Sequence, residues 1–158
     1  MLGLEEILKT IASDIFRQDE WGQTAQYIPE LAGIDPRQFA ISVCLQDGSL
    51  YSAGAADKPF SIQSVAKVFS LVAALGRVGD QLWTRVGREP SGNSFDSVLL
   101  LEQENGRPRN PYVNAGAIVT TDALLAGRAP KLALAEILSL IKHMSDSDSV
   151  YINEAVAA

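Results

Sequence analysis

The chain has 158 residues, of which 47% are hydrophobic and 20% are charged, so it can form one folded domain, or one domain and part of another. Its formal net charge is −6 and its basic residues form no patch, which argues against nucleic acid and anionic membrane surfaces as partners. A single cysteine, Cys44, excludes an internal disulfide, and a single histidine, His143, argues against a histidine-based metal site and a Ser-His-Asp triad.

The first predicted element is an amphipathic helix over about residues 4–16. Apolar residues recur there at helical spacing, while charged and small polar residues take the other face. The apolar stripe consists of Leu4, Ile7, Leu8, Ile11, Ile15 and Phe16. No basic stretch followed by an apolar run opens the chain, and no run of about 18 apolar residues occurs in it. We therefore expect no signal peptide, no membrane span and a cytoplasmic protein.

Two strands joined by a tight turn are predicted over residues 39–45 and 49–53. Apolar and smaller residues alternate in the first run, which indicates a strand that is buried on at least one face. Asp47-Gly48 lies between the runs, and Asp-Gly is a strong signal for a hairpin. Cys44 falls in the first strand, where we expect a small packed side chain rather than a reactive thiol.

The stretch that most resembles catalytic machinery is Ser64-x-x-Lys67, at the start of a predicted helix. Residues three apart share a helix face, with Cβ atoms about 5–6 Å apart, so the lysine can reach the serine hydroxyl. Serine is a weak nucleophile unless a base takes its proton. Residues 65–75 are apolar almost all round the helix, which predicts a buried helix, and burial favours the neutral lysine amine that can act as this base. Ser-x-x-Lys is a signature of serine β-lactamases and penicillin-binding proteins.

A plainer interpretation of the same residues stays open. In many helices a serine at the position of Ser61 or Ser64 is a cap, and a lysine such as Lys67 extends into solvent. Two features favour catalysis. Ser64 opens the helix, where N–H groups can face a developing negative charge, and Lys67 lies on a helix without an evident polar face.

Two more helices are predicted further along the chain. A loop over residues 105–111 precedes a helix over about 114–125, in which Asn114 is either the N-cap or a functional residue. Pro130 opens the next helix, and His143 lies off its apolar face, where we expect it to be solvated. That apolar face contains Leu134, Ile137, Leu138, Ile141 and Met144.

Four longer stretches resemble the serine-dependent glutaminases, a family with the β-lactamase-like fold. They occur in the family's order and cover most of residues 20–125. The stretches are Tyr27-Ile-Pro-Glu-Leu31, Pro59-Phe-Ser-Ile-Gln-Ser-Val-Ala-Lys-Val-Phe69, Gly87-Arg-Glu-Pro-Ser-Gly92 and Arg109-Asn-Pro-Tyr-Val-Asn-Ala-Gly-Ala-Ile118. The last of these is not typical of β-lactamases.

The resemblance implies hydrolysis of L-glutamine to L-glutamate and ammonia, without a metal or an organic cofactor. Carried over position by position, it makes Ser64 the nucleophile, Lys67 its base, and Gln63, Ser64 and Asn114 substrate-contacting residues. Tyr27, whose local context alone favours a packing residue with its hydroxyl at the surface, matches a tyrosine that lines the family's site. The resemblance also implies a homo-oligomer in the complete protein, with a small-molecule substrate and neither nucleic acid nor membrane as partner.

The sequence departs from the family in one large way, because glutaminases of this type are much longer. Two later family motifs, a Ser-Glu…Asp-Arg-Asn stretch and a Lys-Ser-Gly segment, do not occur within the 158 residues. We therefore expect an incomplete α/β fold of the serine β-lactamase and penicillin-binding-protein type. Residues 1–60 would form part of a mostly antiparallel sheet subdomain and residues 61–158 a helical subdomain. A polypeptide of these residues alone is expected to be inactive.

Two other functions stay open on the residues alone. A β-lactamase or D,D-peptidase would use the same Ser64 and Lys67 pair, although the Asn-Ala-Gly-Ala run that begins at Asn114 argues against it. An inactive fragment that serves only as an assembly module is the other alternative, and the missing motifs favour it. Assays with a chromogenic cephalosporin and with glutamine separate the two enzyme hypotheses.

Overall fold

The computed structural model describes residues 3–92, 94, 96, 101–102 and 104–157. The chain divides by its contacts into two compact units. Unit 1 comprises Met1–Ser61 and Asn153–Ala158, and unit 2 comprises Ile62–Ile152. The subdomain division that the sequence suggests at residue 60 stays a prediction, since it refers to a sheet larger than the two strands described.

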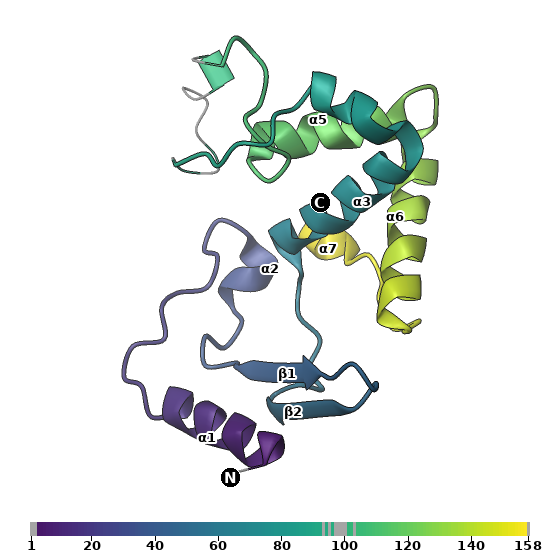
Figure 1. Ribbon diagram of the computed structural model, residues 1–158. Helices are drawn as coiled ribbons and strands as arrows, with labels where there is room; N and C mark the ends of the chain where they lie inside the picture. The colour runs from purple at the N-terminus through teal and green to yellow at the C-terminus, as the bar shows by residue number, and fades with distance from the viewer. Residues whose placement is uncertain (1–2, 93, 95, 97–100, 103, 158) are drawn as a thin grey trace. The chain divides into compact units, whose positions relative to one another are not determined.

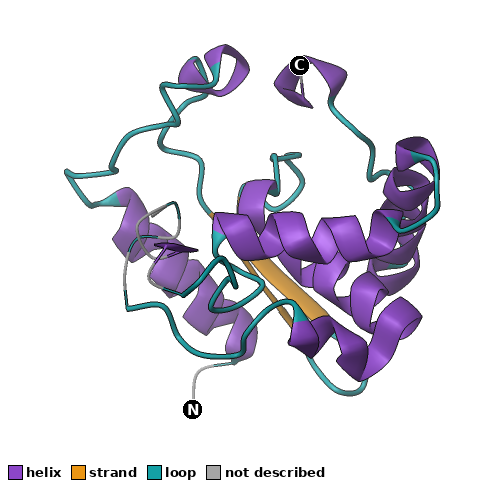
Figure 2. Cartoon of the chain, turned by 90° about the horizontal axis from the view of Figure 1, so that it is seen from above, coloured by secondary structure: helices purple, strands orange, loops and turns teal. Residues whose placement is uncertain are grey.

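Unit 1 consists of a helix packed on a two-stranded antiparallel hairpin (Figure 1), and it also contains two short helices. Helix α1 spans Leu4–Phe16, strand β1 spans Ala40–Cys44 and strand β2 spans Leu50–Gly54. The strands lie side by side in Figure 2, where they are orange. Helices α2 (Pro29–Ala32) and α7 (Glu154–Ala157) contact each other. The predicted N-terminal helix and the hairpin are thus confirmed.

The small core of unit 1 lies between α1 and the hairpin. Leu8 and Ala12 of α1 and Ala53 of β2 are buried there. Half-buried side chains that pack around them are Leu4, Phe39, Ile41, Val43 and Tyr51. Burial of this apolar stripe, at roughly 25 cal/mol per Å² removed from water, is what fixes the helix on the strands. The helical spacing of the stripe therefore determines which face of α1 contacts the hairpin.

Cys44 is exposed, so the prediction of a packed side chain is wrong. Successive side chains of a strand point to opposite faces. Ile41 and Val43 of β1 pack toward the core, whereas Ser42 lies on the other face, where its hydroxyl lies 2.9 Å from that of Ser52. Cys44 shares the face of Ser42 by this alternation. The strand periodicity, rather than the apolar character of the thiol, decides its exposure.

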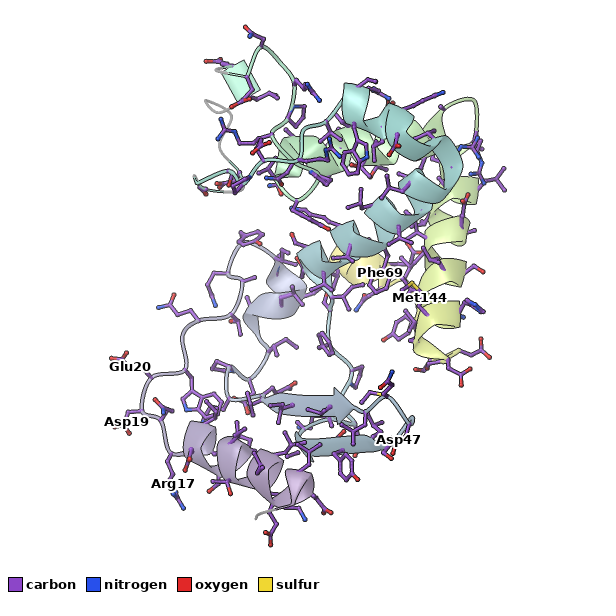
Figure 3. All side chains as sticks on the ribbon, in the orientation of Figure 1. Arg17, Asp19, Glu20, Asp47, Phe69 and Met144 are labelled. Atoms are coloured by element: carbon purple, nitrogen blue, oxygen red, sulfur yellow. The ribbon has the colours of Figure 1, made fainter. Side chains whose placement is uncertain are left out.

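Charged side chains of unit 1 lie in solvent. Figure 3 shows Arg17, Asp19 and Glu20 pointing away from the segment that follows α1, and all three are exposed. Asp47 lies in the hairpin turn, where its Oδ1 accepts a 2.9 Å hydrogen bond from the backbone N–H of Ser49. This bond holds the pKa of the Asp47 carboxyl below its ordinary value. The turn is therefore closed by its own residues.

Unit 2 is helical. A 3₁₀ turn, η1 (Gln63–Val65), leads into α3 (Ala66–Val78), and a second 3₁₀ segment, η2 (Gly79–Thr84), follows it. Helices α5 (Asn114–Leu125) and α6 (Pro130–Ser145) both pack against α3, as Figure 1 shows. The helices predicted from Asn114 and from Pro130 are confirmed, and His143 is exposed as expected. In the described residues, α3 is the element around which the unit is assembled.

The core of unit 2 forms where these helices meet. Its buried residues are Leu71, Ala74, Leu82, Val86, Ala123, Leu124 and Ala133. Thr120 is the buried polar side chain of α5, and its hydroxyl donates to the carbonyl of Gly116 at 2.9 Å. That bond removes the cost of burying an unpaired hydroxyl. The core therefore holds α3 and α5 against each other, and with them the side chains of Lys67 and Asn114 in their first turns.

The prediction that the α3 helix is buried all round is wrong. Leu71 and Ala74 face the core, but Val65, Val68 and Val72 are 56%, 44% and 41% exposed. In the part of the chain that the structure describes, α5 and α6 pack on the core side of α3, and the valine side stays in contact with solvent. An apolar sequence all round a helix predicts burial only where other elements cover every side.

Candidate active site

Ser64 lies in η1, directly before α3, and is exposed. The turn is closed by the backbone N–H of Val65, which donates to the carbonyl of Ile62 at 2.9 Å. Gln63 has φ +44°, in the left-handed region that side chains other than glycine rarely adopt. Such a conformation costs on the order of 1–3 kcal/mol and is found mostly where a site imposes it. Ser64 is thus preceded directly by a residue in a costly backbone conformation.

Lys67 lies in the first turn of α3 and is half-buried. Its Nζ donates to Asn114 Oδ1 at 2.7 Å and to the backbone carbonyl of Tyr112 at 3.0 Å. The amine is thereby held between the start of α3 and the start of α5. The alternative in which Lys67 simply extends into solvent is therefore wrong. The contact between Lys67 and the Ser64 hydroxyl stays a prediction.

Asn114 is the first residue of α5, and Val113 occupies the N-cap position with an extended backbone. The interpretation of Asn114 as the helix cap is therefore wrong. Its Oδ1 is directed instead to the Lys67 amine. With the amide oxygen bound to a lysine, the NH₂ of the same group is the donor that Asn114 can offer a substrate.

Asn110, rather than Asn114, is the asparagine that closes the turn leading into α5. Its Oδ1 accepts hydrogen bonds from the backbone N–H of Tyr112 at 2.9 Å and of Val113 at 3.1 Å. Its Nδ2 donates to the carbonyl of Glu89 at 2.8 Å. Sequence reasoning missed this residue. The signal was Asn110-Pro111 three residues before the helix, because asparagine bonds the backbone two and three residues ahead of it.

The two remaining predicted site residues, Gln63 and Tyr27, are both exposed. Gln63 is exposed and adjoins Ser64 in η1. Tyr27 belongs to unit 1 and is 83% exposed, in agreement with a surface position. Their roles toward a substrate stay predictions.

Among the described residues, no cluster of three histidine, cysteine, aspartate or glutamate side chains is placed to hold a metal ion. No helix in the same part of the chain is long and apolar enough to cross a membrane.

Ser-x-x-Lys is a signature of serine hydrolases related to the β-lactamases, and here its serine lies in the turn directly before α3 while its lysine is held by an asparagine of a second helix. Within that class, the chain matches the model of the family Glutaminase over residues 22–158. The chain belongs to the glutaminase family.

Curated relatives agree with this assignment. A glutaminase of Rhizobium etli (strain CIAT 652) is 50% identical over 157 residues, which cover 99% of this chain and 51% of the relative. A glutaminase of Mesorhizobium japonicum is 52% identical over 155 residues, which cover 98% of this chain and 49% of the relative. The chain thus spans about half the length of the curated relatives it matches.

Solved structures give the same fold. A probable glutaminase, YbaS, matches with a TM-score of 0.84 and 33% identity, over 97% of this chain and 50% of that one. A structure of Mglu, in its tris and glutamate form, matches with a TM-score of 0.87 and 32% identity, over 99% of this chain and 35% of that one. Glutaminases have a β-lactamase-like fold, and the α/β arrangement described above, with its short antiparallel sheet and its helices, agrees with it.

Proposed function

We propose that the protein hydrolyses L-glutamine to L-glutamate and ammonia through an acyl-enzyme on Ser64. The observation that carries the proposal is the position of the Lys67 amine. Lys67 follows Ser64 by three residues, and its amine is held by Asn114 Oδ1 and the Tyr112 carbonyl. Membership in the glutaminase family and the glutamate-bound form of a structural relative support glutamine as the substrate.

In the proposed reaction Lys67 starts as the neutral amine. A neutral amine keeps two N–H groups, which suffice for the Tyr112 carbonyl and Asn114 Oδ1, and its lone pair takes the proton from Ser64 Oγ. Oγ then attacks the side-chain amide carbon of glutamine. The resulting oxyanion develops beside the N–H groups that precede α3, which favour negative charge.

The tetrahedral intermediate then collapses and its C–N bond breaks. The proton held by Lys67 passes to the leaving nitrogen, which departs as ammonia and leaves a γ-glutamyl ester on Ser64. Water attacks this ester, with Lys67 again accepting a proton, and glutamate is released as Ser64 regains its hydrogen. Asn114 Nδ2, Gln63 and Tyr27 are the proposed contacts of the substrate's amino-acid groups.

Because the chain spans about half the length of its curated relatives, the activity is best measured in a chimera. In this chimera, residues 1–158 replace the matching half of the Rhizobium etli glutaminase. We expect ammonia release from L-glutamine and no cleavage of a chromogenic cephalosporin. A polypeptide of residues 1–158 alone is the negative control. A folded chimera that releases no ammonia would contradict the proposal and favour the assembly-module alternative.

Asn114→Asp in the chimera should raise KM for glutamine by about tenfold or more, corresponding to about 1.4 kcal/mol of lost binding. The new carboxylate repels the substrate carboxylate, and it cannot donate the hydrogen bond that the NH₂ group supplies. Steady-state kinetics measure KM and kcat.

The melting temperature separates this role of Asn114 from a structural one. Because Val113 is the N-cap of α5, the exchange should leave the melting temperature of the chimera nearly unchanged. A strong loss of stability with an unaltered KM would mean that Asn114 supports the helix and does not bind substrate.

We further propose a cytoplasmic homo-oligomer. The free, exposed Cys44 is typical of a reducing compartment. Light scattering on the purified chimera measures the oligomeric state.

A further inference from the structure

We propose that Asn110 is a positioning residue for the catalytic lysine, acting through the Tyr112 carbonyl and Asn114. The inference rests on the proposed function, because it takes Lys67 as the base. It goes further by assigning the geometry of Lys67 to a side chain that touches neither the lysine nor, on the proposal, the substrate.

The first step of the argument is that both Lys67 acceptors belong to the short stretch that enters α5. The Tyr112 carbonyl and Asn114 Oδ1 lie 3.0 and 2.7 Å from Nζ. A shift of this stretch therefore moves the amine or breaks one of its bonds. Displacements of about 1 Å in a catalytic group can cost about 10²-fold in rate.

The second step is that Asn110 fixes this stretch from both sides. Its Oδ1 binds the N–H groups of Tyr112 and Val113, at 2.9 and 3.1 Å. Its Nδ2 binds the Glu89 carbonyl at 2.8 Å. One amide group thus ties the entry to α5 to a separate segment of unit 2.

The third step is that the backbone of Asn110 and of the residues before it is held in place, so that its side chain acts from a fixed point. The carbonyls of Pro108 and Arg109 accept hydrogen bonds from the N–H groups of Gly87 and Glu89, at 2.8 and 3.1 Å. A Cβ on Gly116 would lie 1.8 Å from the carbonyl oxygen of Asn110, so only glycine fits there. The Asn110 backbone is therefore pressed against α5 while its side chain reaches to residue 89.

The test compares Asn110→Ala and Asn110→Asp with Asn153→Ala as a matched control. Asn153 precedes α7, and its Oδ1 accepts from the N–H groups two and three residues ahead, at 3.1 and 3.3 Å, which is the spacing that Asn110 uses in its turn. Removing either pair of bonds should cost on the order of 1 kcal/mol of stability. Only Asn110 is linked to the acceptors of Lys67.

Two readouts are measured on the chimera. The first is kcat and KM for glutamine. The second is the rate of Lys67 acetylation by acetic anhydride, followed by mass spectrometry relative to the exposed Lys131. The acetylation rate reports how firmly the amine is held, and it does not require turnover.

For Asn110→Ala we expect kcat to fall by about 10- to 100-fold with a nearly unchanged KM, and Lys67 acetylation to accelerate. Asn110→Asp, which keeps the two bonds to Tyr112 and Val113 but loses the donor to Glu89, should be intermediate in both readouts, and it serves as the test if the alanine variant does not fold. Asn153→Ala should change neither readout.

If the Asn110 variants match Asn153→Ala in kcat and in Lys67 acetylation, the inference is overturned. If the unaltered chimera is inactive but Lys67 acetylation responds as expected, the proposed function fails while the positioning role stands.

Discussion

Ser64→Ala in the chimera is expected to lower kcat for glutamine by about 10⁴- to 10⁶-fold, as removal of the nucleophile does in other serine hydrolases. The hydroxyl oxygen is the atom that forms the acyl bond, so no neighbouring group replaces it. Ser64 is exposed in a 3₁₀ turn, and surface substitutions of this kind change stability by within about 0.5 kcal/mol. The loss should therefore appear in ammonia release and not in the melting temperature.

Ser70→Ala is the matched control for this experiment. Ser70 lies on α3, and its hydroxyl donates to the Ala66 carbonyl at 3.2 Å, a local helix contact. Its removal should leave kcat nearly unchanged. A folded Ser64→Ala protein that retains more than a trace of activity would exclude Ser64 as the nucleophile.

Lys67→Arg is expected to lower kcat by about 10²- to 10⁴-fold, the usual contribution of a general base. Arginine keeps N–H donors for the Tyr112 carbonyl and for Asn114 Oδ1. Its guanidinium stays protonated, however, and cannot take the serine proton. The substitution therefore separates the transfer of a proton from the structural bridge between α3 and α5.

Lys131→Arg, on the exposed side of α6, controls for the general effect of the exchange and should leave kcat unchanged. Steady-state ammonia release and a thermal melt suffice for both variants. Activity of Lys67→Arg close to that of the unaltered chimera would mean that Lys67 holds the two helices together without acting as a base.

Local patterns predicted the elements whose determinants lie close together in sequence. The apolar spacing from Leu4 to Phe16 sufficed to predict α1, although only Leu4, Leu8 and Ala12 pack on the hairpin and Ile7, Ile11 and Phe16 are exposed. Asp47-Gly48 sufficed for the turn because Gly48 has φ +86°, which its missing Cβ allows. The Ser64 and Lys67 spacing and the four longer stretches led to the family that the comparisons show.

Features that depend on distant neighbours could not be predicted in the same way. The exposure of Val68 on α3 depends on which elements cover each side of the helix. The contact of Asn114 with Lys67 joins two helices 47 residues apart in sequence, and a local capping preference gives no sign of it. Asn110 was not predicted as a site residue. Its hydrogen bonds to Tyr112 and Val113 are local, but the Lys67 contacts that they support join segments far apart in sequence.

The most direct test of the account is to trap the acyl-enzyme. The chimera is mixed with radiolabelled L-glutamine, quenched with acid after a few turnovers, digested and analysed by mass spectrometry. The account predicts one labelled peptide, with the mass of a γ-glutamyl ester on Ser64, which is missing from the Ser64→Ala protein. Ammonia release with the label on another residue, or with no covalent label on any peptide, would contradict it.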